Sequence, residues 1–298
     1  MTVLDTFEQV RSSVSGKVGL VPTMGFLHEG HLSLVEAAAA ENDSVVVSVF
    51  VNPTQFGDPS DLDAYPTDFE RDVALATEAG ATCLFAPSVD YMYPAGNRTV
   101  VSVGGVADAM EGMHRPGHFD GVATVVTKLL AGVQPDTAYF GRKDAQQLAV
   151  VSSLGTDLSL PVTVKGMPIV REHSGLALSS RNVHLDADSR VAADNLFASL
   201  STAADRFVDG DRSVQSIREQ VASAVSTVPG VDLEYVELAD AETARPAMAF
   251  SGRQFLAIAA RVGGVRLIDN MTFETDTQSG TVDRGVRLAG TSILYGGS

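Results

Sequence analysis

The stretch from Pro22 to His31 reads PTMGFLHEGH, and it lies between the apolar run KVGLV and the run LSLVEAAAA. The first run predicts a buried strand and the second a helix, so the histidines stand where a strand gives way to a helix. Backbone N–H groups at the start of a helix attract anions. His28 and His31 share one helix face, and Gly30 leaves room for a phosphate beside the backbone. The stretch therefore predicts a phosphate site.

Two other interpretations of the histidine pair stay open. The imidazoles can serve as half-buried polar caps of the helix, or they can bind a metal ion. A His-x-x-His spacing is a weak metal signal, because no thiol and no obvious third ligand accompany it. Imidazole N–H groups can instead donate to phosphoryl oxygens and stabilise a pentacoordinate transition state.

Outward from this stretch, Val-rich runs alternate with helical patterns, which is typical of parallel strands covered on both faces. The pattern predicts an α/β fold, with a Rossmann-like doubly wound parallel sheet over residues 1–169. Its ligand is expected beyond the carboxyl ends of the strands. Two helical stretches and three strand-like runs then predict a second, smaller α+β C-terminal domain, a lid, over residues 170–273. Residues 274–298 are expected to form a loosely attached tail, to which no role is assigned.

Composition narrows the function classes. The chain has 298 residues and a formal charge of -16, with 37 acidic against 21 basic side chains. Such a surface repels nucleic acid, although local donors can still bind a small phosphate ligand. No apolar run approaches the roughly 20 residues of a membrane span. The first residues carry acids and lack a basic-then-apolar pattern, so export is not expected. A single cysteine, Cys83, excludes an internal disulfide, so a cytoplasmic location is expected.

Amides follow the next predicted strand, in the segment VNPTQF. Asn52 and Gln55 stand where polar residues of a parallel sheet usually face the ligand, and amides can bind hydroxyls and carboxylates without adding charge. Capping of a turn by Asn52 ahead of Pro53 is the alternative, and the two roles are compatible.

The segment EGMHRPGHFDGV gathers an acid, two histidines and an arginine before an apolar helix. Arg115 can bind an anionic group, and His118 stands near the predicted helix start. A solvated loop seldom carries so many functional groups.

The segment YFGRKDAQQL repeats the order strand, glycine, helix start. Lys143 at a helix N-terminus is electrostatically unfavourable unless an anion joins it, which favours a phosphate ligand over a solvated lysine. Asp144 suits the helix start, and Gln147 lies one turn further on.

The segment REHSGLALSSRNVHL contains the run Ser179, Ser180 and Arg181. Two hydroxyls and a guanidinium match several phosphoryl oxygens at once. As a loop between the two domains it could close over a nucleotide, and a helix-cap role of the serines is the alternative.

Taken in order, these segments resemble the pantothenate synthetase (pantoate–β-alanine ligase) family, within the wider HxGH nucleotidyltransferase superfamily. The resemblance extends from about residue 17 to 186, and YVELAD and RLIDN are similar to the family's C-terminal domain. It implies a homodimeric cytoplasmic ligase of the coenzyme A pathway. ATP would adenylate D-pantoate with Mg²⁺ assistance and release diphosphate, and β-alanine would then attack the acyl adenylate to give pantothenate and AMP.

The resemblance also implies roles for individual residues. His28, His31, Lys143 and Arg181 are the expected catalytic groups. The expected ATP contacts are Met24, His28, His31, Gly141, Lys143, Asp144, Val170, Ser179, Ser180 and Arg181. Pantoate is expected to contact Met24, Asn52, Gln55 and Gln147. Asp72, Arg115 and His118 are expected to support the site, with Asp72 as a candidate metal ligand.

One departure stands out, because Tyr65–Asp68 reads YPTD where the family commonly has Tyr-Pro-Arg-Thr. Whether the nearby Arg71 replaces the missing arginine stays open. Two alternative functions also stay open: another HxGH-type nucleotidyltransferase acting on a different acceptor, and a non-catalytic ATP-binding relative. No Gly-x-Ser-x-Gly elbow or other nucleophile constellation is present. Its absence fits carboxylate adenylation, because that reaction uses no nucleophile from the enzyme.

Overall fold

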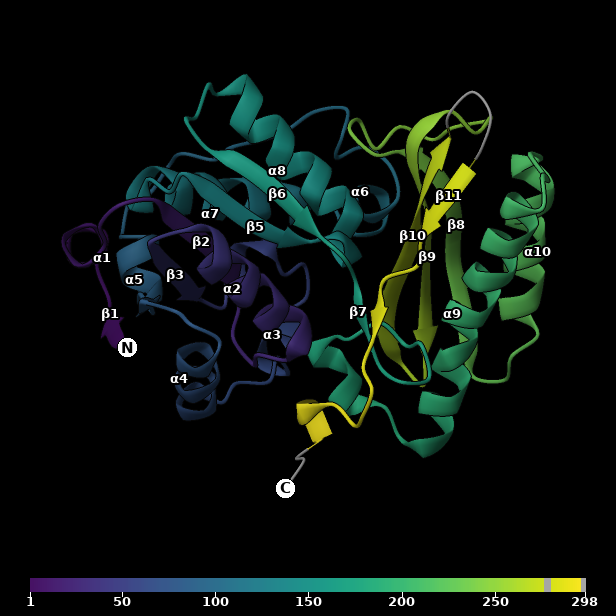
Figure 1. The fold of residues 1–298 in the computed structure, drawn as a ribbon, viewed down its shortest axis with the longest axis horizontal. Helices are drawn as coiled ribbons and strands as arrows, with labels where there is room; N and C mark the ends of the chain where they lie inside the picture. The colour runs from purple at the N-terminus through teal and green to yellow at the C-terminus, as the bar shows by residue number, and fades with distance from the viewer. Residues whose placement is uncertain (276–279, 296–298) are drawn as a thin grey trace. The chain divides into compact units, whose positions relative to one another are not determined.

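The computed structural model describes residues 1–275 and 280–295 (Figure 1). The chain forms two compact units, Met1–Gly141 with Gln147–Met167, and Arg142–Gln146 with Pro168–Ser298. The sequence places the boundary between residues 169 and 170, two residues later than the structure does. It also gives no sign that residues 142–146 belong to the second unit. Their carbonyl groups explain this assignment, because Asn270 of the second unit binds two of them.

The first unit contains a six-stranded sheet in the order β1-β4-β3-β2-β5-β6, with every pair parallel. The predicted Rossmann-like sheet is thereby confirmed. Its strands are β1 (Thr2–Leu4), β2 (Val18–Thr23), β3 (Ser44–Val49), β4 (Cys83–Phe85), β5 (Thr137–Gly141) and β6 (Thr163–Met167). The sequence missed β1, because three residues at a sheet edge leave no continuous apolar run.

Helices connect these strands, and α2 packs against β2, β3 and β5. They are α1 (Phe7–Ser13), α2 (Glu29–Glu41), α3 (Pro59–Asp63), α4 (Phe69–Glu78), α5 (Val89–Met92), α6 (Glu111–His114), α7 (His118–Val133) and α8 (Ala145–Asp157). Leu20 and Val46 at the centre of the sheet are fully buried. A sheet buried in this way leaves the ends of its strands as the place for polar groups.

The second unit pairs an antiparallel sheet with two helices, which confirms the predicted smaller α+β domain. The sheet has the order β11-β10-β9-β8, and α9 and α10 contact it. The elements are α9 (Ala187–Val208), α10 (Val214–Ser226), β8 (Val231–Asp240), β9 (Gly252–Val262), β10 (Val265–Thr275) and β11 (Gly280–Asp283). Leu196, Phe207 and Phe273 lie in its hydrophobic core.

The C-terminal segment differs from the expected loose tail. Strand β11 pairs with β10, and β12 (Val286–Arg287) pairs in parallel with β7 (Val170–Arg171). The yellow end of the ribbon in Figure 1 follows this path through the second unit. Its strands are too short to show a periodic pattern, and they form because β7 and β10 offer unpaired edges. Residues 276–279 and 296–298 of the expected tail lie outside the described residues.

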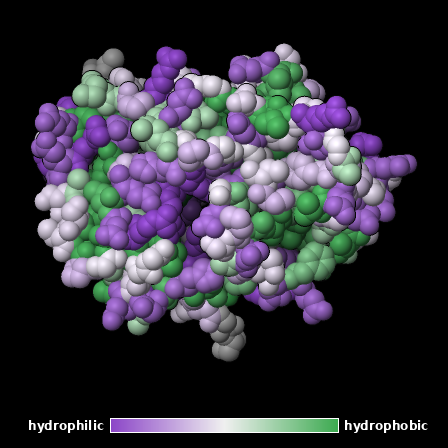
Figure 2. All heavy atoms as spheres, turned by 180° about the vertical axis from the view of Figure 1, so that it is seen from behind, coloured by the Kyte–Doolittle hydropathy of each residue, from purple (hydrophilic) through white to green (hydrophobic). Residues whose placement is uncertain are grey.

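Within the part of the chain that the structure describes, no helix is long and apolar enough to cross a membrane. Figure 2 shows one face of the molecule, on which hydrophilic residues and apolar patches are interspersed.

Candidate active site

The two histidines cap helix α2 reciprocally. His28 is the N-cap residue, and its Nδ1 accepts the backbone N–H of Gly30 at 3.1 Å. The backbone N–H of His28 donates to Nδ1 of His31 at 3.4 Å, and the two ring centroids are 4.0 Å apart. A Cβ at Gly30 would lie 2.9 Å from the His28 ring. The sequence assigned the space beside Gly30 to a phosphate, but in the structure the His28 ring uses that space.

This capping fixes the tautomer of both rings. A ring nitrogen that accepts an N–H carries no proton itself, so each neutral imidazole holds its proton on Nε2. An Nε2–H group is a donor of the kind that a phosphoryl oxygen requires. The capping and phosphate interpretations are therefore compatible, because the two functions use different nitrogen atoms.

Asp72 of α4 holds the turn that precedes His28. Its two oxygens accept the backbone N–H groups of Phe26 at 2.8 Å and of Leu27 at 2.6 Å, and its side chain is buried. Arg71 donates to the carbonyl of Leu27 at 2.9 Å. The turn needs this support, since Phe26 has a positive φ angle of 51°, a conformation that non-glycine residues rarely adopt. Burial raises the pKa of Asp72, and the two N–H groups and the charge of Arg71 oppose that rise.

We expect Asp72→Asn to weaken both stability and activity. The new amide would place an NH2 group opposite a backbone N–H, which leaves buried donors without an acceptor. That loss should lower the free energy of unfolding by about 1–3 kcal/mol. The value of kcat/KM should also fall, because the turn leading into His28 loses its anchor. Urea denaturation and steady-state kinetics measure the two effects.

Asp68→Asn provides the matched control for that prediction. Asp68 caps the same helix by accepting the backbone N–H of Arg71 at 3.2 Å, and asparagine caps a helix as well as aspartate does. The control should therefore leave stability and kinetics unchanged. Wild-type behaviour of Asp72→Asn would show that the turn does not depend on this carboxylate.

The residues expected to bind pantoate form a connected group at the end of β3. Asn52, almost fully buried, donates to Oε1 of Gln55 at 2.9 Å and to the carbonyl of Gly121 at 3.2 Å. Its own oxygen accepts from the hydroxyl of Tyr93 at 2.7 Å. The amide of Gln55 in turn contacts Sδ of Met24 at 3.2 Å. The structure thus brings Met24, Asn52 and Gln55 together, with Asn52 orienting Gln55.

Arg115 and His118 support the same group from α7 and the residues before it. His118 donates from Nδ1 to the carbonyl of Gln55 at 2.9 Å, since a carbonyl can only accept. Its Nε2 then accepts from Arg115 at 3.2 Å, and Glu111 lies 3.8 Å from the same guanidinium. These contacts hold the backbone of Gln55, and the supporting role of Arg115 and His118 stays a prediction. Gly141 ends β5, and Gln147 is half-buried near the start of α8.

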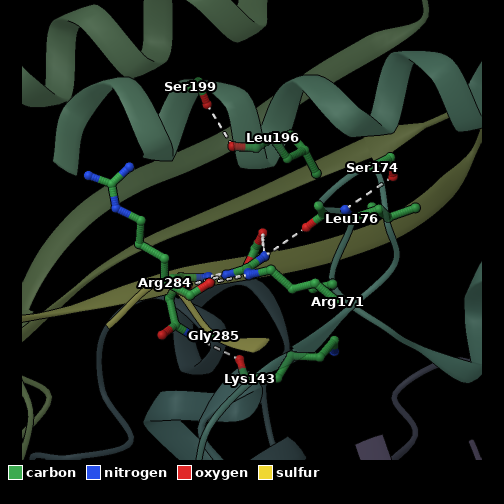
Figure 3. Close-up of polar contacts among 12 residues, drawn as sticks. Lys143, Arg171, Ser174, Leu176, Leu196, Ser199, Arg284 and Gly285 are labelled. Atoms are coloured by element: carbon green, nitrogen blue, oxygen red, sulfur yellow. Dashed lines mark hydrogen bonds and ion pairs between the residues drawn. The ribbon is translucent and has the colours of Figure 1, made fainter. Parts of the chain in front are cut away.

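In the second unit, Lys143 lies in the 3-10 turn Arg142–Asp144, immediately before α8 begins. Asn270 of β10 donates to the carbonyls of Arg142 and Lys143, each at 2.9 Å. Figure 3 shows the Lys143 side chain extending away from the carbonyl that makes this contact. Its ammonium is 3.9 Å from the carboxylate of Asp144. Asn270 therefore fixes the backbone that carries the lysine, a role that the sequence did not predict.

The remaining expected ATP residues also lie in the second unit. Val170 belongs to β7, and Ser179 caps the 3-10 turn Ser180–His184 by accepting the backbone N–H of Arg181 at 3.3 Å. Ser180 is buried, while Arg181 is half-buried. The capping alternative for Ser179 is thus realised in the structure, and its hydroxyl keeps a proton that it can donate.

A resident metal site does not fit the described residues. No group of three or more His, Cys, Asp and Glu side chains within them is arranged to hold a metal ion. The buried carboxylate of Asp72, the candidate ligand, is engaged by two backbone N–H groups. In this structure Asp72 acts on the turn that precedes His28.

Two residues of the first unit were missed although they shape the site. Gly121 stands inside α7 and lies so close to Thr54 and Gln55 that a Cβ would come within 2.4 Å of the carbonyl of Thr54. Tyr93 bonds Asn52 from a segment far away in the sequence. A glycine within an apolar helix was an available signal for the first, whereas nothing in the local sequence indicates the second.

A parallel Rossmann-like sheet with two histidines at the start of helix α2 is the arrangement of a nucleotide-binding fold. The comparison with known proteins narrows that class of fold to a family. Residues 2–272 match the family model described as pantoate-beta-alanine ligase. The chain therefore belongs to the pantoate-beta-alanine ligase family. Its activity is the condensation of pantoate with β-alanine using ATP.

Individual relatives agree with this assignment. The chain is 46% identical over 282 residues to a pantothenate synthetase of Moorella thermoacetica, covering 93% of this chain and all of the relative. The pantothenate synthetase structure from Thermus thermophilus has a TM-score of 0.87 at 46% identity, covering 91% of this chain and 98% of that one. A Francisella tularensis pantoate-beta-alanine ligase, complexed with beta-gamma ATP and beta-alanine, has a TM-score of 0.75 at 35% identity, covering 91% and 97%.

Proposed function

We propose that the ligation proceeds through a pantoyl adenylate. A carboxylate oxygen of D-pantoate attacks the α-phosphorus of ATP, and the bond to the β-phosphate breaks to release diphosphate. The amine of β-alanine then attacks the acyl carbon, the C–O bond to AMP breaks, and the amine nitrogen loses a proton as pantothenate forms. Both steps need stabilisation of charge on phosphoryl oxygens and no nucleophile from the protein.

The reciprocal capping of His28 and His31 is the observation that carries this proposal. Because each Nδ1 accepts a backbone N–H, each Nε2 holds a proton for donation to an ATP phosphate. These donors are set before the substrate arrives, since the helix start itself holds the rings. Preorganised donors of this kind stabilise developing charge without the cost of reorganising water.

We assign the cationic groups of the second unit to the same ATP. Lys143 and Arg181 would neutralise charge on the triphosphate and the leaving diphosphate, and Ser179 and Ser180 would donate hydrogen bonds to their oxygens. Asp144 and Val170 would lie beside the nucleoside. Support comes from the similarity to the Francisella tularensis ligase complexed with an ATP compound and β-alanine. Mg²⁺ would accompany ATP mainly through phosphate oxygens and water, its usual way of binding.

Pantoate is assigned to Met24, Asn52, Gln55 and Gln147. The support is the group around Gln55, in which Asn52 donates to the side-chain oxygen of Gln55 while His118 holds the backbone carbonyl of the same residue. Amides without net charge suit a small hydroxy acid whose carboxylate has to remain nucleophilic. We also propose that the protein is a cytoplasmic homodimer and that its second unit excludes water from the reaction. These proposals rest on the family resemblance.

Diphosphate exchange into ATP tests the intermediate directly. With the purified full chain, labelled diphosphate should enter ATP when pantoate is present and β-alanine is absent. AMP should exceed the amount of enzyme, which requires multiple turnovers, only when ATP, pantoate and β-alanine are all supplied. Formation of ADP and phosphate would overturn the adenylate route, and exchange driven by another acid but not by pantoate would overturn the substrate assignment.

A further inference from the structure

The C-terminal segment from Arg284 to Tyr295 packs along the strand that leads into the Ser179–Arg181 turn. The backbone N–H of Val286 donates to the carbonyl of Ile169 at 2.7 Å, and that of Leu288 donates to the carbonyl of Arg171 at 2.9 Å. On the other edge of the same strand, Leu178 donates to the carbonyl of Val170 at 3.0 Å. Strand β7 therefore lies between the C-terminal segment and the residues immediately before Ser179.

Arg171 fastens the start of this segment. Its guanidinium donates to the carbonyl of Arg284 at 2.5 Å and to the carboxylate of Asp269 at 2.6 Å, and the side chain is fully buried. Figure 3 shows Arg171 reaching the backbone at Arg284. A buried ion pair with further hydrogen bonds holds its partners in one geometry, so the segment is anchored at this end.

Tyr295 anchors the other end of the C-terminal segment through a hydrogen bond to Glu172. The hydroxyl of Tyr295 donates to Oε1 of Glu172 at 2.5 Å, and Arg190 donates to both oxygens of the same carboxylate at 2.9 and 3.0 Å. The Arg190 guanidinium lies 3.9 Å from the centroid of the Tyr295 ring. Burial and the neighbouring Glu172 raise the pKa of Tyr295, so the phenol remains a donor throughout the neutral range.

Asn182 links this group to the turn. The side-chain amide of Asn182 donates to the same Oε1 of Glu172 at 3.3 Å, and the backbone carbonyl of Asn182 accepts from Arg190 at 3.1 Å. The backbone N–H of Asn182, which is fully buried, donates to the carbonyl of Ser179 at 2.9 Å. The carboxylate that Tyr295 holds is thus bonded to a residue of the turn that carries Ser180 and Arg181.

We propose that Tyr295 is a positioning residue for ATP binding: through Glu172 and Asn182 it sets the backbone of the Ser179–Arg181 turn. The inference rests on the proposed role of that turn in holding the ATP phosphates. The region matched by the family model ends at residue 272, so the segment that supplies Tyr295 lies beyond it. Tyr295 acts on the turn through other residues and is assigned no contact with substrate.

Tyr295→Phe tests the proposal, since it removes the hydroxyl and keeps the ring beneath Arg190. We expect KM for ATP to rise about three- to tenfold, the range that one lost hydrogen bond gives. The KM for pantoate should stay unchanged, because its proposed contacts lie in the first unit. Tyr91→Phe is the matched control: its hydroxyl accepts the backbone N–H of Phe7 at 2.8 Å in the first unit, and its loss should leave KM for ATP unchanged.

Arg181→Ala separates this inference from the function on which it rests. A rise in KM for ATP with Arg181→Ala but not with Tyr295→Phe would overturn the positioning role alone. No rise with either variant would overturn the role of the turn and the inference with it. Equal increases in KM for ATP and pantoate, together with a lower melting temperature, would show that Tyr295 serves general stability and would also overturn the proposal.

Discussion

Replacing His28 with alanine is expected to lower kcat by about 10²–10³-fold, the usual effect of removing one preorganised donor to a developing charge. The substitution removes the Nε2–H group that we assign to the ATP phosphates. It also removes the cap on the backbone N–H of Gly30, which should lower the free energy of unfolding by about 1 kcal/mol. Single-turnover AMP formation and thermal unfolding measure the two effects separately.

His28→Asn separates the capping function from the chemical one. Asparagine is among the best N-cap residues, so its side-chain oxygen should accept the Gly30 N–H and restore stability. Its short amide cannot reproduce the Nε2–H of an imidazole, so kcat should stay near the alanine level. Recovery of both stability and turnover in His28→Asn would show that the histidine serves only as a cap, the interpretation that the sequence left open.

The fold was largely predictable because strong local signals dominate it. The continuous valine runs of β3 and the glycine that follows α4 mark buried parallel strands and helix ends without help from distant residues. The same logic failed at the C-terminal end. Strands β11 and β12 have only four and two residues, and they exist because β10 and β7 provide edges to pair with. Such pairing is a property of the folded unit and leaves no periodic pattern in the sequence.

For the candidate site, the sequence indicates residue types at the ends of strands but not the partners that hold them. The sequence indicates that His28 and His31 share a helix face, and the structure adds that His28 caps the backbone N–H of Gly30 while His31 caps that of His28. Asp72 was expected near the phosphates or a metal, but its partners are N–H groups from residues more than 40 positions away. Pairings at such separations depend on the tertiary fold, which local spacing cannot encode.

Gly121→Ala is the second substitution with a large expected effect, although Gly121 has no side chain to offer a substrate. An added Cβ would lie 2.4 Å from the carbonyl oxygen of Thr54 and 2.6 Å from the backbone nitrogen of Gln55. Both atoms belong to the 3-10 turn Pro53–Gln55, so either that turn or α7 has to shift. Overpacking of this kind should lower the free energy of unfolding by about 1–3 kcal/mol.

The larger consequence should appear in catalysis. Moving the turn displaces Gln55 and breaks the bond from Asn52 to the carbonyl of Gly121, so the group assigned to pantoate loses its alignment. A shift of about 1 Å in a substrate-positioning group costs on the order of 10²-fold in rate. We therefore expect kcat/KM for pantoate to fall by about 10–100-fold, while KM for ATP changes little.

Gly155→Ala shows whether the effect comes from that contact or from losing a helical glycine in general. Gly155 is also buried within a helix of the first unit, α8, but its added Cβ would meet Val164 at an ordinary 3.8 Å. Alanine there should raise stability by up to about 1 kcal/mol, because it favours the helix without a clash. If Gly121→Ala proved as benign as Gly155→Ala, the close approach of α7 to the turn would not be what orients Gln55. A fall in kcat/KM for pantoate in Gly121→Ala but not in Gly155→Ala would show that the orientation of Gln55 depends on the absence of a side chain at Gly121.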